Sequence, residues 1–400
     1  MKLDSDIAFF NSNSGTNYLC FGEGDKLIFN TKTDFNSLQS FLNNNKGKFI
    51  YGYISYDVKN DLEKLVSQNN DNLNFPLIYF HTPKNVIEFN SNQQTFIQGE
   101  YSIENQQMID LFLKELNFDS LEKINQFQAR ISKSEYIEKV NQLKEHIQRG
   151  DIYEINFCQE YYAENVNIDS PIQLYNAINN ATQAPFSVFL KHDEFSVFCG
   201  SPERFIQKKG SKISSQPIKG TAKRGQSEEE DLQLKKKLST DPKEISENVM
   251  IVDLVRNDLS KIAKKGSVKV DELFGIHTYK TVHQMISTIS CEIDDDINFI
   301  NILNATFPMG SMTGAPKVNA MRLSEQHESF KRGLYSGSIG YILPNGDFDF
   351  NVVIRSLLHN AKTKYLSCSV GGAITINSDA EKEYEECQTK INKLLTVFTN

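Results

Sequence analysis

Short apolar stretches, many with alternating polar positions, recur along the chain and predict β-strands. Lys48–Tyr56 and Phe75–Phe80 are rich in aromatic and β-branched residues, as buried strands are. The Asn- and Ser-rich segment Ser67–Asn74 between them is typical of a loop. We expect further strands at residues 186–190, 195–199, 336–343, 349–358 and 365–370.

Three other segments carry apolar residues at the spacing of an amphipathic helix. Ser134–Gly150 is the first, and its glycine is a stop signal. The second begins where Asp241 can act as N-cap and Pro242 occupies the first helical position. The third opens at Ser378–Glu381, which has the spacing of a capping box, and continues toward the C-terminus.

Strands and helices alternate irregularly, without the β-α-β rhythm of a parallel sheet. The sequence therefore predicts an α+β fold with large mixed or antiparallel sheets flanked by helices. Before residue 123, Asn-, Ser- and Gln-rich pieces separate the strand-like stretches, and a more regular region begins around residues 124–130. We expect an N-terminal region at 1–123 and a second region at 124–400 that carries the candidate chemistry, both within one globular unit.

Composition narrows the function classes. The 400 residues carry a net charge of −8, which argues against a nucleic-acid partner because no broad basic surface is available. The acidic start Met1–Asp6 is unlike a secretory leader, and no apolar run is long enough to span a membrane. The cysteines are scattered without a metal-binding or disulfide pattern, so we expect reduced thiols and a cytoplasmic protein.

Two acidic pairs have the spacing that places both carboxylates on one helical face. Glu244 and Glu247 lie in the helix capped by Asp241, and Glu383 and Glu386 lie in the C-terminal helix. If the pairs converge, they form an all-oxygen site suited to Mg²⁺. The alternative is that these acids only favour the helix N-termini, where negative charge is stabilising.

Glycine-rich segments could hold an anionic ligand. Val370–Ile374 is predicted to end a strand, so its backbone N–H groups could bind a carboxylate, although from these residues alone a tight turn is the better explanation. Phe307–Lys317 is a loop rich in Gly and Pro without the ending of a phosphate-binding loop. Arg355 lies in an apolar stretch and either points outward or binds an anion in a pocket.

Lys219 is the sharpest candidate for covalent chemistry. Pro217 stiffens its approach and Gly220 permits a tight turn, so the lysine is held in a defined position. A solvated loop lysine is the plainer alternative. Glu203 could act as an acid or base at another turn, with a surface role as the alternative, and His283 could equally be a hydrogen-bonded core residue.

Taken together, these motifs resemble the chorismate-binding enzyme family, which includes component I of anthranilate synthase, component I of aminodeoxychorismate synthase, and the isochorismate and salicylate synthases. Eight segments follow the family's order, and Gly52–Leu62 is similar to its N-terminal motif, so that residues 1–123 resemble a reduced version of the family's N-terminal part. The eight segments are Gly150–Asn156, Ser201–Arg204, Gln216–Thr221, Glu247–Asp258, Phe307–Lys317, Arg332–Gly337, Val370–Ile374 and Glu383–Glu386.

The resemblance implies the anthranilate synthase component I-like fold, a two-sheet sandwich flanked by helices, and a set of site residues. It implies that Mg²⁺ binds the ring carboxylate of chorismate and is held by Glu244, Glu247, Glu383 and Glu386. The catalytic residues that it implies are Lys219, Glu203 as general acid, and His283. The substrate-binding positions that it implies are Thr221, Ser311, Tyr335, Arg355, Gly372, Ala373 and Lys390, of which Tyr335 and Arg355 match the pair that holds the enolpyruvyl carboxylate.

Lys219 distinguishes the members, because anthranilate synthases carry Ala at this position and aminodeoxychorismate synthases carry Lys. The implied reaction is attack of Lys219 on ring C2, loss of the C4 hydroxyl, and displacement of the lysine by ammonia. The product is 4-amino-4-deoxychorismate, a precursor of para-aminobenzoate and folate. Glu154 stands where the members that add water carry a lysine.

Ammonia must come from a partner, because the sequence contains no glutamine amidotransferase signature. We therefore expect a separate glutaminase subunit. The alternatives are an anthranilate synthase component I and a non-catalytic binding subunit with this fold.

Overall fold

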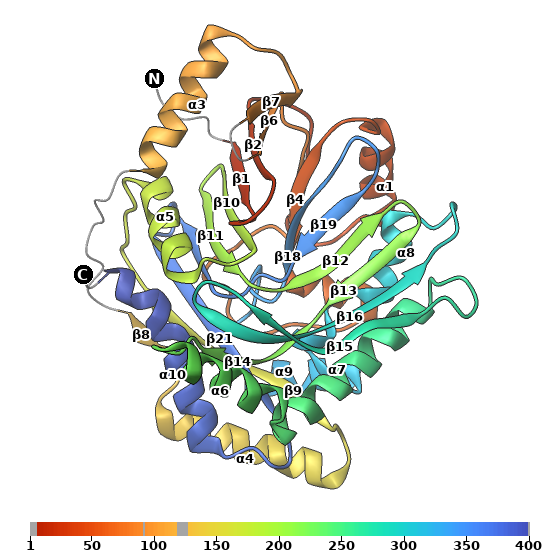
Figure 1. The fold of residues 1–400 in the computed structure, drawn as a ribbon, viewed down its shortest axis with the longest axis vertical. Helices are drawn as coiled ribbons and strands as arrows, with labels where there is room; N and C mark the ends of the chain where they lie inside the picture. The colour runs from red at the N-terminus through yellow and green to blue at the C-terminus, as the bar shows by residue number, and fades with distance from the viewer. Residues whose placement is uncertain (1–5, 91–92, 118–126, 399–400) are drawn as a thin grey trace.

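The computed structural model describes residues 6–90, 93–117 and 127–398. They fold into two large β-sheets with helices packed against them (Figure 1). Every strand pairing in these residues is antiparallel, which is one of the two arrangements that the α+β prediction allowed. The predicted boundary at residues 123 and 124 lies outside the described residues, but strands from both sides of it contribute to each sheet.

The first sheet has eleven strands in the order β17-β9-β21-β20-β11-β10-β1-β2-β6-β7, with β8 paired to β9. Its strands are β1 (Ile7–Asn11), β2 (Asn17–Phe21), β6 (Asn85–Asn90), β7 (Gln93–Gln98), β8 (Gln128–Ala129), β9 (Glu154–Ala163), β10 (Phe186–His192), β11 (Phe195–Ser201), β17 (Gly314–Ala315), β20 (Ser356–Asn360) and β21 (Tyr365–Ile374).

The second sheet has ten strands in the order β14-β16-β13-β12-β19-β18-β4-β5-β3, with β15 paired to β16. Its strands are β3 (Lys26–Phe29), β4 (Ile50–Ile54), β5 (Ile78–His81), β12 (Arg204–Lys209), β13 (Lys212–Gln216), β14 (Ile218–Lys223), β15 (Lys269–Thr278), β16 (Val282–Glu292), β18 (Ser338–Ile342) and β19 (Phe348–Asn351).

Helices α4, α6, α7 and α10 gather at the lower end of the sheets in Figure 1. The α-helices are α1 (Phe35–Asn44), α2 (Lys59–Glu63), α3 (Ile103–Leu116), α4 (Lys133–Arg149), α5 (Pro171–Thr182), α6 (Glu228–Ser239), α7 (Pro242–Ser260), α8 (Phe299–Thr306), α9 (Lys317–His327) and α10 (Ala380–Leu395). Three short 3₁₀ segments are η1 (Tyr56–Val58), η2 (Gly310–Met312) and η3 (Thr396–Phe398).

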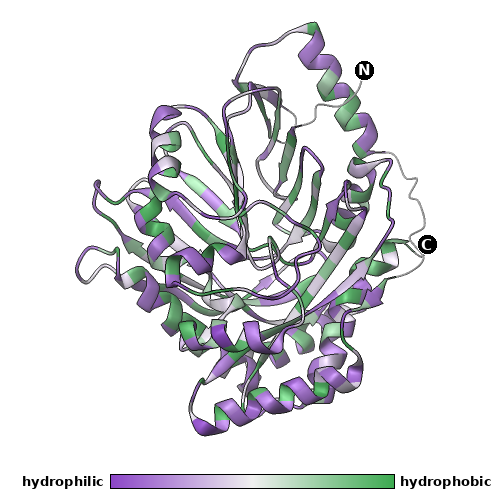
Figure 2. Ribbon diagram, turned by 180° about the vertical axis from the view of Figure 1, so that it is seen from behind, coloured by the Kyte–Doolittle hydropathy of each residue, from purple (hydrophilic) through white to green (hydrophobic). Residues whose placement is uncertain are grey.

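Two apolar layers hold these elements together. Successive side chains of β1 enter the two layers alternately. Ala8 and Phe10 belong to the cluster that contains residues of both sheets together with α7 and α8. Ile7 and Phe9 face the opposite way and join the cluster that α3, α4, α5 and α10 cover. Figure 2 shows apolar residues concentrated on the strands, whereas the helices carry mixed colouring. The two-layer core follows from strands that are buried on both faces.

One predicted helix end and one predicted helix start are confirmed, and another predicted start is off by a residue. Gly150 ends α4 in the left-handed conformation, at φ 83°. The Asp241 carboxylate caps α7 by accepting from two backbone N–H groups, and Pro242 is at the first helical position. The predicted capping box at Ser378 is wrong: Asp379 caps α10, and the Ser378 hydroxyl instead accepts a hydrogen bond from the Thr375 N–H.

The predicted strand at 349–358 is wrong, because two strands replace it. β19 belongs to the second sheet and β20 to the first, so the chain must cross between the sheets at residues 352–355. Arg355 lies in this crossing with a φ of 53°, a left-handed conformation that serves the turn.

The Val370–Ile374 segment ends a strand, as expected, but the expected tight turn is wrong. The segment is the paired C-terminal part of β21, and its register places Gly371 opposite Cys158 of β9. A Cβ atom at Gly371 would lie 2.7 Å from the Cys158 sulfur, so glycine is required by close packing rather than by a turn. In the described residues, no helix is long and apolar enough to cross a membrane.

Candidate active site

Lys219 lies in β14, at the edge of the second sheet where it approaches β9 of the first. Its Nζ donates a hydrogen bond to Glu154 Oε1 at 2.7 Å and lies 3.9 Å from Glu247 Oε2. The lysine is buried, with 9% of its surface exposed. Burial alone would lower the pKa of Lys219, but the carboxylates of Glu154 and Glu247 outweigh it, and the pKa is raised. The solvated loop lysine is therefore excluded, and the ammonium form is favoured in this state.

Glu203 lies in the tight connection between β11 and β12 and is 5% exposed, so a surface role is excluded. The Ser311 hydroxyl donates to Glu203 Oε1 at 2.6 Å. Burial raises the pKa of Glu203 to about 7, and the Ser311 hydrogen bond and the Lys219 charge oppose it. A carboxyl group with this pKa can both donate and accept a proton near neutral pH.

The acidic pairs of α7 and α10 face each other across Lys243. Its Nζ lies 3.0 Å from Glu383 Oε1 and 3.8 Å from Glu247 Oε1. Burial raises the pKa of Glu247 to about 7, and burial also raises that of Glu244. Glu386 is exposed and pairs with Lys390 at 2.7 Å. The first turns of α7 and α10 thus bring Glu244, Glu247 and Glu383 into one charged cluster. Glu386 lies beside Lys390.

The chemistry of this cluster suits a hard cation, although the side chains as they stand do not enclose one. Among the described residues, no group of three or more acidic, histidine or cysteine side chains is close enough to hold a metal ion. Glu247 Oε1 is nevertheless buried without a hydrogen-bond partner, which is costly unless a donor or cation satisfies it. Lys243, with 44% of its side chain exposed, supplies positive charge here and can swing out to solvent.

β21 presents backbone groups to the same region. Lys390 Nζ donates to the Gly371 carbonyl oxygen at 3.0 Å, so this carbonyl points away from β9. N–H and C=O groups of residues two apart share a side of a strand, so the Ala373 N–H also points away from β9. In the described part of the chain, no other strand pairs with this side of residues 371–374. Gly372 faces α10, since a Cβ there would lie 3.5 Å from Glu383 Oε2.

Arg355 and Tyr335 lie close enough to interact electrostatically. Burial lowers the pKa of Arg355, and the nearby Tyr335 and Glu386 oppose that effect. The guanidinium forms no hydrogen bond or ion pair with any described residue. Tyr335 is buried, and burial raises its pKa well above the usual value. A shielded guanidinium without a direct ion pair or hydrogen bond is a suitable site for a carboxylate.

His283 is held by protein groups. On β16, its Nε2 lies 3.0 Å from Asp231 Oδ1 of α6, and its Nδ1 lies 3.0 Å from the Thr278 hydroxyl. Arg224 forms a bidentate pair with the same aspartate, at 2.8 Å for both bonds. Thr221 is exposed on β14, two residues from Lys219. A structural role therefore accounts for the visible contacts of His283.

The structure also identifies three residues for which the motifs gave no role. Glu154 contacts Lys219, Lys243 lies between the acids, and Asp231 orients His283. Glu154 and Lys243 lie within motifs that the sequence analysis identified. Their closeness in sequence to other candidate residues could have indicated a role. Asp231 is one acid in the run that starts α6, and nothing in the sequence distinguishes it.

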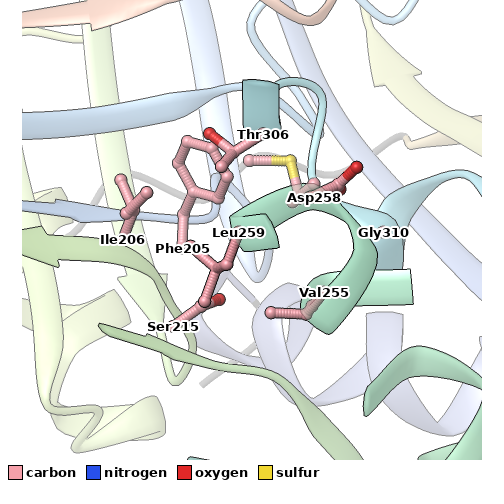
Figure 3. A pocket seen from close by; sticks show the side chains of 9 residues that line it. Phe205, Ile206, Ser215, Val255, Asp258, Leu259, Thr306 and Gly310 are labelled. Carbon is pink, nitrogen blue, oxygen red and sulfur yellow. The ribbon is translucent and has the colours of Figure 1, made fainter. Parts of the chain in front are cut away.

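A small pocket behind the loop of Ser311 is a separate feature (Figure 3). None of the predicted site residues lines it, and Asp258, its acidic residue, is paired with Lys317 and with Lys261. Its lining consists of Phe205, Ile206, Ser215, Val255, Asp258, Leu259, Thr306, Met309 and Gly310. The pocket therefore lies outside the cluster of charged groups.

The two antiparallel sheets and the buried lysine-carboxylate cluster at their edges define an α+β protein whose site is built from charged side chains. The profile of the chorismate binding enzyme family matches residues 5–396. The chain belongs to this family, as the sequence motifs predicted.

Individual relatives agree with this assignment. Aminodeoxychorismate synthase component 1 of Klebsiella aerogenes is 39% identical over 67% of this chain, and the aligned part spans 59% of that relative. Aminodeoxychorismate synthase component 1 of Bacillus subtilis is 31% identical over 92% of this chain and 81% of its own length. The crystal structure of anthranilate synthase component I from Streptococcus pneumoniae superimposes with a TM-score of 0.79 at 24% identity, covering 96% of this chain and 92% of that one. That likeness shows that the fold is shared.

Proposed function

We propose that this chain aminates chorismate to 4-amino-4-deoxychorismate, as the chorismate-binding component of an aminodeoxychorismate synthase. The observation that carries the proposal is the position of Lys219, a buried amine beside Glu154 and within the electrostatic reach of Glu203. Relatives named aminodeoxychorismate synthase component 1 support it. A lysine nucleophile needs a fixed position and a nearby acid for the leaving group, and the cluster provides both.

Each of the two carboxylates of chorismate would be held by its own pair of residues in this site. Arg355, whose guanidinium forms no direct ion pair with a described residue, and Tyr335 would hold the enolpyruvyl carboxylate. The backbone N–H of Ala373, together with Lys390, would hold the ring carboxylate. Gly372 leaves room for the ring carboxylate, because the nearest atom that a Cβ at this position would meet is Glu383 Oε2, 3.5 Å away.

Mg²⁺ is part of the proposal, and the carboxylates of α7 and α10 would hold it. The four carboxylates, of which Glu247 has a buried oxygen without a hydrogen-bond partner, would supply the all-oxygen donor set that magnesium prefers. Lys243 would then have to leave its place between Glu247 and Glu383. When bound, the ion would supply positive charge for a substrate carboxylate. The four ligands are Glu244, Glu247, Glu383 and Glu386.

The covalent step follows from two groups of the charged cluster, Lys219 and Glu203. The Lys219 amine forms a bond to ring C2, the two conjugated ring double bonds shift, and the C4–O bond breaks with a proton from Glu203, releasing water. Ammonia then attacks C4, the two double bonds shift back, and the C2–N bond breaks to release Lys219. The enolpyruvyl group is retained. His283 and Thr221 would be further residues of this site, and Ser311 would orient the acid through its hydrogen bond to Glu203.

The partner follows from the ammonia requirement. The relatives are named component 1, which implies a second component, and we propose a glutamine amidotransferase subunit that supplies ammonia. A cytoplasmic location agrees with the free, buried state of the six cysteines.

An anthranilate synthase is the competing enzyme, since a solved relative of the same fold has that name. The experiment is incubation with chorismate, Mg²⁺ and ammonium, followed by mass spectrometry of the products. We expect 4-amino-4-deoxychorismate from the parent and from Lys223→Ala, which removes an exposed lysine of the same strand, but not from Lys219→Ala. Fluorescent anthranilate with release of pyruvate would refute the proposal, and no turnover at high ammonium would indicate a binding subunit.

A further inference from the structure

We propose that Asp57 is a positioning residue of the chorismate site, which acts on Tyr335 through the backbone of Gly333. The inference rests on the proposed function, in which Tyr335 helps to hold the enolpyruvyl carboxylate. It concerns the N-terminal motif Gly52–Leu62, to which neither the resemblance nor the relatives' names give a role.

Both polar backbone groups of Gly333 are held by this N-terminal motif. Asp57 Oδ2 accepts a hydrogen bond from the Gly333 N–H at 2.9 Å, and the Tyr56 N–H donates to the Gly333 carbonyl oxygen at 2.8 Å. A carboxylate forms a stronger hydrogen bond with an N–H group than a neutral acceptor does. Gly333 has a φ of 57°, in the left-handed region that favours glycine, so the turn begins at the residue that Asp57 contacts. The start of the loop 333–337, two residues before Tyr335, is therefore fixed from the N-terminal region.

The other end of the loop is held by the chain crossing at residues 352–355. The Ser336 N–H donates to the Val353 carbonyl oxygen, and the Val353 N–H donates to the Gly337 carbonyl oxygen, both at 2.9 Å. Tyr335 thus lies between an attachment to the N-terminal motif and an attachment to the segment that carries the anion-binding arginine. A shift at the first attachment therefore moves the tyrosine relative to the arginine.

Asp57 is itself enclosed and fixed. The residue is 3% exposed, and its second oxygen, Oδ1, accepts from the Ser67 hydroxyl at 3.2 Å. Lys59, which is equally buried, lies 3.8 Å from the same oxygen and donates to Ser67 Oγ at 3.1 Å. A buried ion pair adds little to stability compared with apolar side chains of the same size, so fixing the geometry is the better account of this pair. The contact that it adds to the site is the hydrogen bond to Gly333.

Arg332 also holds this part of the chain, but at a different point. The central carbon of its guanidinium lies 4.5 Å from the centroid of the Tyr56 ring. The guanidinium donates to the carbonyl oxygens of Met312 and Asn156 at 2.6 and 2.8 Å. These contacts anchor the arginine side chain, whereas the turn that follows is oriented by the hydrogen bond to Asp57.

The alternative is that Asp57 only stabilises the fold. Asp57→Asn and Asp57→Ala separate the two roles, because both leave Lys59 without its counter-charge but only asparagine keeps an oxygen for the Gly333 N–H. Glu160→Ala is the matched control away from Tyr335: Glu160 is buried, pairs with Arg130 at 2.8 Å and accepts a hydrogen bond from a serine hydroxyl. The control should lose stability without a change in substrate affinity.

The measurement is steady-state kinetics with chorismate, Mg²⁺ and ammonium, and with 4-hydroxybenzoate as a competitive inhibitor. The inhibitor keeps a ring carboxylate and a ring hydroxyl but has no enolpyruvyl carboxylate. We expect Asp57→Ala to raise KM for chorismate by about tenfold or more, the range for one weakened carboxylate contact, with kcat changed by less than about threefold and the inhibition constant by less than about twofold. Asp57→Asn should recover most of the affinity. An unchanged KM, an equal loss of affinity for both compounds, or an equal loss in Asp57→Asn would overturn the role of Asp57.

A second test shows whether Asp57 acts through Tyr335. On a Tyr335→Phe background, Asp57→Ala should raise KM by less than about threefold, because the contact that it disturbs is already lost. An increase of about tenfold on both backgrounds would contradict the proposal.

A further variant keeps the proposal testable if Asp57→Ala does not fold because Lys59 is left buried without its counter-charge. Asp57→Ala/Lys59→Met removes that charge and tests the same contact with Gly333. Failure of the amination has a different signature, because the parent would then bind chorismate without forming the aminated product. The affinities for chorismate and 4-hydroxybenzoate would in that case be compared by calorimetry, with the same outcomes expected.

Discussion

Replacing Glu203 by glutamine should stabilise the protein at alkaline pH while removing its activity. The reason is that Glu203 is buried and its pKa is raised to about 7 from the usual 4.5. The charged form is therefore less stable in the folded protein than in the unfolded chain. Glutamine has nearly the same shape and can keep the contact with Ser311 without the buried charge.

The magnitude follows from the two pKa values. Each tenfold step in proton affinity is worth 1.36 kcal/mol, so the distance from 4.5 to about 7 corresponds to roughly 3 kcal/mol. Between these values the folded state binds more protons than the unfolded state, so the stability of the parent falls as the pH rises through this window. At pH 8 almost all of the roughly 3 kcal/mol is lost, whereas at pH 5 less than about 1 kcal/mol is lost. This is a large share of the ~5–15 kcal/mol stability of a typical domain.

Urea unfolding at pH 5 and pH 8 measures this effect, and Glu164→Gln, an exposed carboxylate, is the control. Glu203→Gln should exceed the parent by about 2–3 kcal/mol at pH 8, and the gain should nearly vanish at pH 5. Glu247 also has a raised pKa, but it is present in both proteins and cancels in the difference. Turnover should fall at least about a hundredfold. A variant that is less stable than the parent at pH 8, or a gain independent of pH, would refute the reasoning.

Three further changes test other parts of the site. Arg355→Lys loses planar two-point recognition, so we expect KM for chorismate to rise by roughly ten- to a hundredfold with a smaller change in kcat, measured by steady-state kinetics. Glu247→Gln should raise the Mg²⁺ concentration that gives half-maximal activity by at least about tenfold, and an unchanged magnesium titration would exclude Glu247 as a ligand. Arg332→Leu leaves Glu328 buried without its partner 2.5 Å away, so the free energy of unfolding should fall by about 3–5 kcal/mol in denaturant titrations; a loss below 1 kcal/mol would contradict this.

Much of the fold was predictable because its signals are local. The caps of α4 and α7, and the strands around Phe186 and Phe195, are set by residues next to one another in sequence. The strand break near Arg355 was not predictable, because it arises where the chain passes from one sheet to the other. An apolar stretch has the same sequence pattern whether its residues join one sheet or two.

The candidate site shows the same division. Gly371 was expected to form a turn, but its smallness serves close packing against Cys158 of β9, a residue more than two hundred positions away. The bond between Lys219 and Glu154 also joins distant strands, so the sequence could name both residues without pairing them. The roles of the predicted metal ligands and substrate-binding residues stay predictions.

The most direct test of the amination is the mass of the parent protein after incubation with chorismate and Mg²⁺ in the absence of ammonia. The account predicts a gain equal to chorismate less one water, located by peptide mapping on Lys219 and discharged as 4-amino-4-deoxychorismate when ammonium is added. Turnover to the aminated product without any adduct, or an adduct on another residue, would contradict the assignment of Lys219 as nucleophile.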